Sequence, residues 1–384
     1  MQNELKIILN QLKENPIFRM SLCSKELFHS NFWAWMLEQY PDSIKCFVQD
    51  YKKDNYGEFE KVYREKQSFD LVIETDKKFI VIENKFKSMP IKGQLNKYSK
   101  KDGNIDKFIN ERSSDKKEVK LLISYIEPYF DVNEIGWEYI TYERLSEKLN
   151  DFFKDVHDKN PYIKNYLEML NSFIQIKKLF ALEKNPNYKD FFEIFNNDKN
   201  LQDLLSDMNF ESTLKRIYMS EVYKYIRKNI KEKLPDIRFY IRDDIDEKNN
   251  EFLKFNNCMI LNLDYSGLTK NVFIDFFVYQ EKMAIGFTIS ASHYRITLGS
   301  YSKEKDLSKI VKNLIEDEKF EFFNDKNITP KNKKYYSFGE NWKYQILQEI
   351  ESERKISELS SLLICDLEKL LKHDLKTLLC CDQN

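Results

Sequence analysis

The segment QSFDLVIETDKKFIVIENKFKSMPIKGQLNKY, residues 67–98, contains two short apolar runs with a polar turn between them. The runs are Leu71–Ile73 and Phe79–Ile82, both rich in β-branched residues, and the turn is the five-residue stretch 74–78. Short runs of this kind on either side of a polar turn predict a β-hairpin, around which the N-terminal region is organised.

Three charged residues lie at the open end of this predicted hairpin. Asp70 opens the first strand, whereas Glu83 and Lys85 close the second. Alternate residues of a strand share one face, so Glu83 and Lys85 point to the same side, and pairing across the turn places Asp70 opposite them. Two carboxylates this close repel each other unless a cation lies between them, and such oxygen ligands suit Mg²⁺ or Mn²⁺. The pattern therefore predicts a divalent metal site.

The order of these residues resembles a known nuclease signature. Asp70, followed across a hairpin by Glu83, Asn84 and Lys85, is similar to the motif of the PD-(D/E)XK nuclease superfamily. Phe69 stands where the name-giving proline would be, at a position that varies widely within the superfamily.

Two flanking segments extend the resemblance to roughly residues 20–150. Upstream, the predicted helix Lys25–Leu37 looks like the first helix of the superfamily, in which Glu26 would be an additional acid beside the metal. Downstream, Gln94 and Tyr98 are one helical turn apart, similar to the Gln and Tyr that follow the lysine in many members. The resemblance implies an α/β fold, a restriction-endonuclease-like mixed sheet flanked by helices.

The resemblance also implies a metal-dependent chemistry. Asp70, Glu83 and the backbone carbonyl of Asn84 would hold Mg²⁺ or Mn²⁺, and Glu26 would hold a second ion or bind the first through water. The ion would polarise the scissile phosphate and lower the pKa of a bound water.

Two further side chains complete the implied site. Lys85 would orient the attacking water and offset developing charge, while Gln94 would steady the lysine or contact the phosphate backbone. The implied protein is a Mg²⁺-dependent nuclease that binds nucleic acid, with DNA favoured over RNA, and a role in restriction, repair or phage defence that rests on analogy alone. A homodimer would suit the cutting of both strands of a duplex.

Rival interpretations stay open at this point. An isolated Glu-x-Lys is a weak signal, because Glu and Lys are common in this chain and usually mark a solvated strand edge. The shared order of helix acid, hairpin acids, lysine, Gln and Tyr favours the nuclease. The alternatives are a non-catalytic nucleic-acid-binding module or subunit of a larger assembly on the same fold, and an assembly component whose second domain is the working part.

Charge is unevenly distributed along the chain. The net charge is −1, yet residues 77–120 hold thirteen Lys or Arg and only six Asp or Glu. Such a basic segment around the predicted site suits a phosphate backbone, although a merely solvated lysine-rich helix would look the same.

Composition limits the class of protein. A chain of 384 residues with 33% charged residues is typical of two globular domains. It contains no apolar run of about 18 residues, and its first segment does not resemble a signal peptide, so we expect a cytoplasmic protein without a membrane span. The six cysteines show no metal-binding spacing and are expected to be reduced, and His29 is expected to serve packing or hydrogen bonding rather than catalysis.

The segment KNPNY, residues 184–188, is the strongest boundary signal. We therefore expect a nuclease-like catalytic domain over residues 1–183 and an α+β domain with a recognition or regulatory role over residues 184–384. In the first domain we expect a polar lead-in at 64–68 and an exposed connection at 100–117. Further predicted elements are strands at 119–126 and 137–141 and helices at 142–153 and 162–182.

The second domain carries no catalytic motif. Residues 191–234 show helical periodicity, and the segments between 237 and 299 predict an antiparallel meander. Its aromatic residues could stack on bases, although core packing is the better expectation. Helices are expected at 306–315, 341–350 and 355–372.

Overall fold

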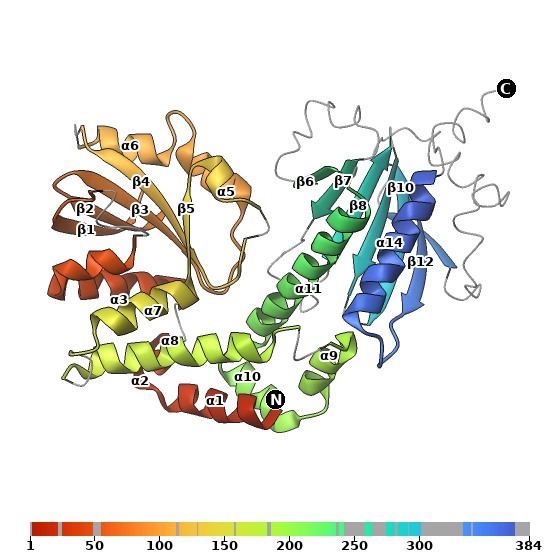
Figure 1. Ribbon diagram of the computed structural model, residues 1–384, viewed down its shortest axis with the longest axis horizontal. Helices are drawn as coiled ribbons and strands as arrows, with labels where there is room; N and C mark the ends of the chain where they lie inside the picture. The colour runs from red at the N-terminus through yellow and green to blue at the C-terminus, as the bar shows by residue number, and fades with distance from the viewer. Residues whose placement is uncertain are drawn as a thin grey trace. The chain divides into compact units, whose positions relative to one another are not determined.

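The computed structural model describes residues 2–21, 25–48, 55–112, 115–128, 130–156, 159–182, 186–235, 238–241, 258–262, 274–280, 283–290, 292–300, 333–338 and 341–372. The chain divides into two compact units. The first comprises Met1–Ala181 together with Asp198–Ser220, and the second comprises Leu182–Asn197 together with Glu221–Asn384. Each unit is built on its own sheet (Figure 1).

The first unit contains a five-stranded mixed sheet in the order β1-β2-β3-β4-β5. The first three strands form an antiparallel meander, and β3, β4 and β5 run parallel. The strands are β1 (Phe59–Lys66), β2 (Phe69–Thr75), β3 (Lys78–Lys85), β4 (Lys117–Ser124) and β5 (Glu138–Thr141). β3 is the central strand, and its residues 79–84 are all buried, as expected for a strand covered on both faces.

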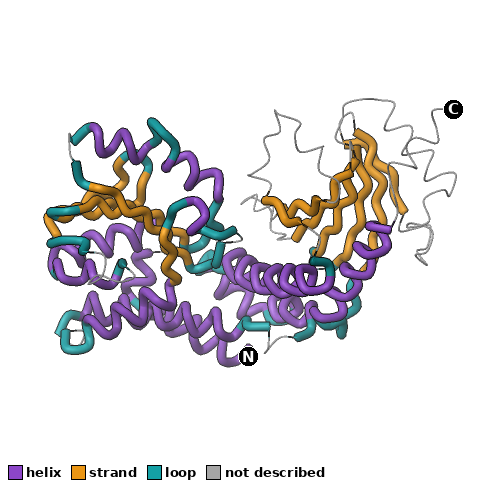
Figure 2. The backbone as a smooth tube through the Cα atoms, turned by 45° about the horizontal axis from the view of Figure 1, so that its top comes forward, coloured by secondary structure: helices purple, strands orange, loops and turns teal. Residues whose placement is uncertain are grey.

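Helices cover both faces of this sheet (Figures 1 and 2). α5 and α6 lie on one side, while α3, α7 and α8 lie on the other. The helices of this unit are α1 (Gln2–Glu14), α2 (Pro16–Ser21), α3 (Lys25–Gln39), α5 (Lys92–Ser99), α6 (Asn104–Asn110), α7 (Tyr142–Phe152), α8 (Pro161–Leu179) and α10 (Lys199–Asp207), with 3-10 turns at Pro41–Cys46 and Asn133–Ile135. This arrangement confirms the predicted mixed sheet flanked by helices.

Two elements of the first unit differ from the sequence expectation. In the expected polar lead-in at 64–68, residues 64–66 are the end of strand β1 and 67–68 form the turn to β2. β1 pairs with β2 and carries mostly charged side chains because it lies at the sheet edge. The expected exposed connection at 100–117 contains helix α6, whose Ile105 and Phe108 are buried.

The second unit is an α+β structure. Its seven strands are ordered β11-β12-β10-β9-β8-β7-β6, antiparallel except for the parallel pair β6 and β7. They are β6 (Arg238–Ile241), β7 (Cys258–Asn262), β8 (Ile274–Gln280), β9 (Met283–Ile289), β10 (His293–Ser300), β11 (Lys333–Phe338) and β12 (Asn341–Glu349). The helices are α9 (Tyr188–Asn196) and α14 (Ile356–Lys372), and the C-terminal part of α11 (Glu211–Lys233), which begins in the first unit.

The meander is therefore present, but one expected helix is wrong. Residues 341–350 form strand β12, which pairs with β10 on one side and β11 on the other. The expected helix at 355–372 corresponds to α14, and the expected helix at 306–315 lies outside the described residues. α11 and α14 lie side by side, where the Asn229 amide donates to the Ser360 hydroxyl at 3.1 Å (Figure 1).

The part of the chain that the structure describes contains no helix that is both long and apolar enough to cross a membrane.

Candidate active site

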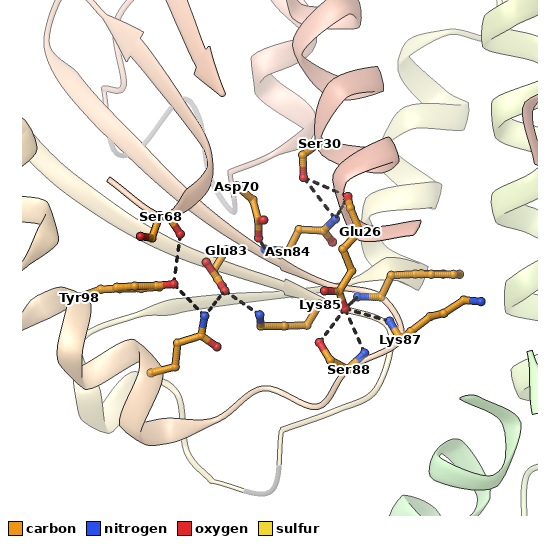
Figure 3. A network of polar contacts seen from close by, with 12 residues as sticks. Glu26, Ser30, Ser68, Asp70, Glu83, Asn84, Lys85, Lys87, Ser88 and Tyr98 are labelled. Carbon is orange, nitrogen blue, oxygen red and sulfur yellow. Dashed lines mark hydrogen bonds and ion pairs between the residues drawn. The ribbon is translucent and has the colours of Figure 1, made fainter. Parts of the chain in front are cut away.

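The β2–β3 hairpin places its acids opposite each other. Its turn is tighter than the five residues expected, because the Thr75 hydroxyl accepts a hydrogen bond from the Lys78 N–H at 2.8 Å and only residues 76–77 separate the strands. The register pairs Leu71 with Ile82, so Asp70 lies opposite the end of β3. There the Asn84 N–H donates to Asp70 Oδ2 at 2.7 Å (Figure 3).

Glu83 and Lys85 form a buried ion pair on one face of β3. The Lys85 ammonium lies 2.8 Å from Glu83 Oε1, and the two side chains are 13% and 2% exposed. The second carboxylate oxygen, Glu83 Oε2, is buried without a hydrogen-bond partner. An unpaired oxygen of this kind costs free energy, so it needs an explanation at this position.

Helix α5 supplies a second donor to Glu83. Gln94 Nε2 donates to Glu83 Oε1 at 2.8 Å and to the Tyr98 hydroxyl at 2.7 Å. The Tyr98 hydroxyl in turn donates to the Ser68 carbonyl at 3.1 Å, at the start of β2 (Figure 3). The predicted one-turn spacing of Gln94 and Tyr98 thus brings both side chains to the acid pair.

Glu26 lies beside the same strand end but binds backbone groups. Its Oε1 accepts hydrogen bonds from the N–H groups of Phe86, Lys87 and Ser88 at 3.0–3.2 Å and from the Ser88 hydroxyl at 2.6 Å. The carboxylate therefore holds the bend that follows Lys85 (Figure 3). Ser88 was not predicted from the sequence, and no spacing rule would have singled it out.

Asn84 joins the strand to the helices on the opposite face. Its side-chain amide donates to the Glu26 carbonyl at 3.0 Å and accepts from the Tyr142 hydroxyl at 2.6 Å. Tyr142 is placed by Thr141, which ends β5 and caps α7 by accepting from the Arg144 N–H. Because the side chain of Asn84 is used in this way, only its backbone carbonyl could serve a metal.

The electrostatics of the cluster disfavour its negative charges. Burial first, and the Asp70 carboxylate second, raise the pKa of Glu83 to about 7. Burial likewise raises the pKa of Asp70 to about 6, although the Asn84 N–H favours its charged form. Burial alone would lower the pKa of Lys85, but the charge and hydrogen bond of Glu83 outweigh it and hold that pKa above its ordinary value.

The residues present fit a hard divalent cation. Among the described residues no three His, Cys, Asp or Glu side chains already form a group that could hold a metal ion. The fit rests instead on the unpartnered Glu83 oxygen, on the Asp70 carboxylate across the hairpin, and on oxygen donors that such cations prefer. A cation here would favour the charged forms of both carboxylates, which burial disfavours.

His29 lies near the site but inside the core. It is 1% exposed, and its Nδ1 is 2.9 Å from the Tyr166 hydroxyl. Burial, with a contribution from the charge of Lys87, lowers the pKa of His29 to about 3, so the ring is neutral at pH 7. This agrees with the expected packing role.

Comparison with protein-family models matches residues 16–174 to the family described as the PD-(D/E)XK nuclease superfamily. The comparisons with curated proteins and with solved structures found no match. The matched segment includes the whole hairpin, the helix with Glu26 and the helix with Gln94. The match to the PD-(D/E)XK nuclease superfamily therefore covers the N-terminal region, which contains every site residue predicted from the sequence.

Proposed function

We propose that this chain is a metal-dependent nuclease that hydrolyses phosphodiester bonds of nucleic acid. The observation that carries the proposal is the buried Glu83–Lys85 pair, whose carboxylate keeps one oxygen without a partner next to Asp70. Structural ion pairs normally satisfy both oxygens, whereas a nuclease needs an open oxygen for a metal and a lysine beside it.

Asp70, Glu83 and the Asn84 carbonyl would hold Mg²⁺ or Mn²⁺. When bound, the ion would supply a Lewis acid for the phosphate and lower the pKa of a water. The N–H and C=O of one strand residue point to the same side, so the Asn84 carbonyl faces the strand of Asp70, as its N–H does. Glu26 would join only through water or a second ion, since its Oε1 is engaged by residues 86–88.

Lys85 would act on the phosphate and the attacking water. Its raised pKa keeps the ammonium protonated at neutral pH, so it can donate a hydrogen bond and offset charge that develops on the phosphate oxygens. Gln94 would keep Glu83 in place, because it donates to the same oxygen as Lys85 does.

We also propose a substrate, a role for each domain and a cellular setting. The basic segment 77–120 supports nucleic acid as the substrate, with DNA ahead of RNA. We assign catalysis to the domain expected over residues 1–183, with residues 198–220 of the same unit supporting it, and recognition or regulation to the rest of residues 184–384. The protein would be cytoplasmic and would act as a homodimer when both strands are cut. Restriction, repair or phage defence are the settings in which such an activity would serve.

The test is cleavage of linear and circular DNA, single-stranded DNA and RNA, with Mg²⁺, Mn²⁺ or chelator. Glu83→Gln and Lys85→Met should abolish cutting. An exposed pair of the same chemistry, Asp42 and Lys45 at 2.7 Å, gives the matched controls Asp42→Asn and Lys45→Met, which should cut like the wild type. If the wild type binds metal and nucleic acid but cuts nothing, the binding-module alternative replaces the nuclease.

A further inference from the structure

The bend at residues 86–88 follows the proposed catalytic lysine directly. Lys85 ends β3, and its carbonyl accepts from the Tyr125 N–H at 2.9 Å. Beyond that bond the chain leaves the sheet, so the position of the bend controls how the end of β3 is held. Glu26 binds the bend from one side.

A segment far along the chain binds the bend from another side. Arg216 Nη1, on α11, donates to the Lys87 carbonyl at 2.8 Å. In return, the Lys87 ammonium donates to the Asn209 carbonyl at 2.8 Å and lies 5.2 Å from the centre of the Phe210 ring. These residues belong to the first unit but lie beyond the segment 16–174 that matches the nuclease family.

The contact is packed as well as polar. Phe210 is fully buried and stacks on Phe86 with 6.4 Å between ring centroids, and its ring is tilted against that of Phe173 at 5.4 Å. Arg216 is half-buried, so water competes less for its hydrogen bond to a carbonyl than at a fully exposed side chain. Charge-assisted hydrogen bonds of this kind are short and direction-dependent, so this one can hold the Lys87 carbonyl in a fixed position.

We propose that Arg216 is a positioning residue for the active site, which completes the nuclease core from outside the family-matched segment. Arg216 and Glu26 grip the bend together and so fix the backbone from which Lys85 projects. The inference rests on the proposed nuclease function, because it assigns Arg216 to the alignment of Lys85. It touches neither substrate nor metal.

The experiment compares Arg216→Met and Arg216→Lys with the wild type in the full-length protein. Lys228→Met is the matched control, because Lys228 is an exposed cation on the same helix. Arg216→Met should lower kcat by roughly 10- to 100-fold with little change in KM, since a small misplacement of a catalytic group costs rate rather than binding. Arg216→Lys keeps a donor and should retain more of the rate, and Lys228→Met should match the wild type.

Amide hydrogen exchange gives a readout that does not need activity. In Arg216→Met, the N–H groups of residues 86–88 should exchange faster, while those in the middle of β3 and β4 keep their wild-type protection. Unchanged exchange at the bend, or an unchanged kcat, overturns the inference. Exchange that accelerates equally throughout the sheet also overturns it, since Arg216 would then only stabilise the fold. If the wild type cuts nothing, the proposed function fails, and exchange alone decides whether Arg216 holds the bend.

Discussion

Among the described residues, each unit contains one almost fully buried carboxylate, and the two carboxylates lie in different environments. Glu83 in the first unit is 2% exposed and Asp366 in the second is 3% exposed, so both are equally removed from water. Asp366, on α14, accepts a hydrogen bond from the neutral hydroxyl of Tyr294 on β10 at 2.9 Å. Glu83 faces a second acid, Asp70, and leaves one oxygen unpaired.

The difference separates a structural acid from a functional candidate. Burial alone does not mark a site, because Asp366 is buried within an ordinary sheet–helix contact. Glu83 differs because burial and Asp70 disfavour its charged form, while Lys85 lies beside it and one of its own carboxylate oxygens has no hydrogen-bond partner. Substitutions near Glu83 and at Asp366 should therefore have different effects on activity and stability.

The largest expected effect is on cleavage. Asp70→Asn should lower the single-turnover rate by at least about 1,000-fold, equivalent to ~4 kcal/mol of lost transition-state stabilisation, because a proposed metal ligand is removed. Asp366→Asn keeps an oxygen acceptor for Tyr294 and should cut at the wild-type rate. Comparable losses in both variants would show that the two acids are not different in kind.

Metal binding should stabilise the protein through Asp70 and not through Asp366. At about 100 times its Kd, Mg²⁺ should add about 2.7 kcal/mol to the free energy of unfolding of the wild type. Thermal unfolding with Mg²⁺ and with chelator measures the shift. Asp366→Asn should retain the shift and Asp70→Asn should lose it; an equal shift in both would contradict a site at Asp70.

Glu83 should also give the metal-free protein a pH-dependent stability. Its pKa is raised from 4.5 to about 7, by burial first and Asp70 second, so the folded state holds the proton more tightly than the unfolded state. The resulting stability is full below about pH 4.5 and is lost as pH rises through about 7, a change on the order of 3 kcal/mol. Denaturant unfolding of Glu83→Gln should lack this component; an identical pH profile in the wild type would refute the assignment.

Asp366→Ala should destabilise the second unit without affecting chemistry. Removal of the carboxylate leaves the buried Tyr294 hydroxyl without this acceptor, at a cost of roughly 1.5 kcal/mol. Urea unfolding should detect the loss, and the cleavage rate at a permissive temperature should be unchanged. A lost rate with intact stability would instead give Asp366 a functional role.

The smallest expected effect is at Tyr98, whose hydroxyl accepts a hydrogen bond from Gln94. Tyr98→Phe removes the hydroxyl that links Gln94 to the Ser68 carbonyl, which should cost about 1 kcal/mol of stability and a few-fold in rate. Comparison of melting temperatures and kcat with Tyr162→Phe, an exposed tyrosine, provides the control. A loss as large as that of Asp70→Asn would mean that Tyr98 acts on the reacting groups directly.

The parts of the fold that could be predicted are the local ones. The hairpin is encoded by apolar runs a few residues apart. Its register places Asp70 opposite Glu83, although the turn has two residues where five were expected. Strand β1 could not be found by alternation, because its residues FEKVYREK are mostly charged at a half-exposed edge. Strand β12 was mistaken for a helix, although Trp342, Tyr344 and Ile346 alternate with polar residues, the spacing of a strand.

The sequence predicts that Asp70, Glu83 and Lys85 lie together, but it does not predict the residues that hold the end of β3 in place. Tyr142 and Arg216 reach the end of β3 from 58 and 129 residues away, and no motif relates such positions. Glu26 is a similar case. The sequence predicts its position on a helix, but its hydrogen bonds to residues 86–88 depend on packing between α3 and β3.

The hydrogen bonds at the end of β3 differ widely in sequence separation. Asn84 and Asp70 are 14 residues apart, Ser88 and Glu26 are 62, and Arg216 and Lys87 are 129. Closing a longer loop costs more chain entropy, and contacts between distant residues form late in folding. We therefore expect the hairpin to assemble its acids early and the Arg216 hydrogen bond to form last. A partly folded chain would then hold the proposed metal ligands before its lysine is aligned.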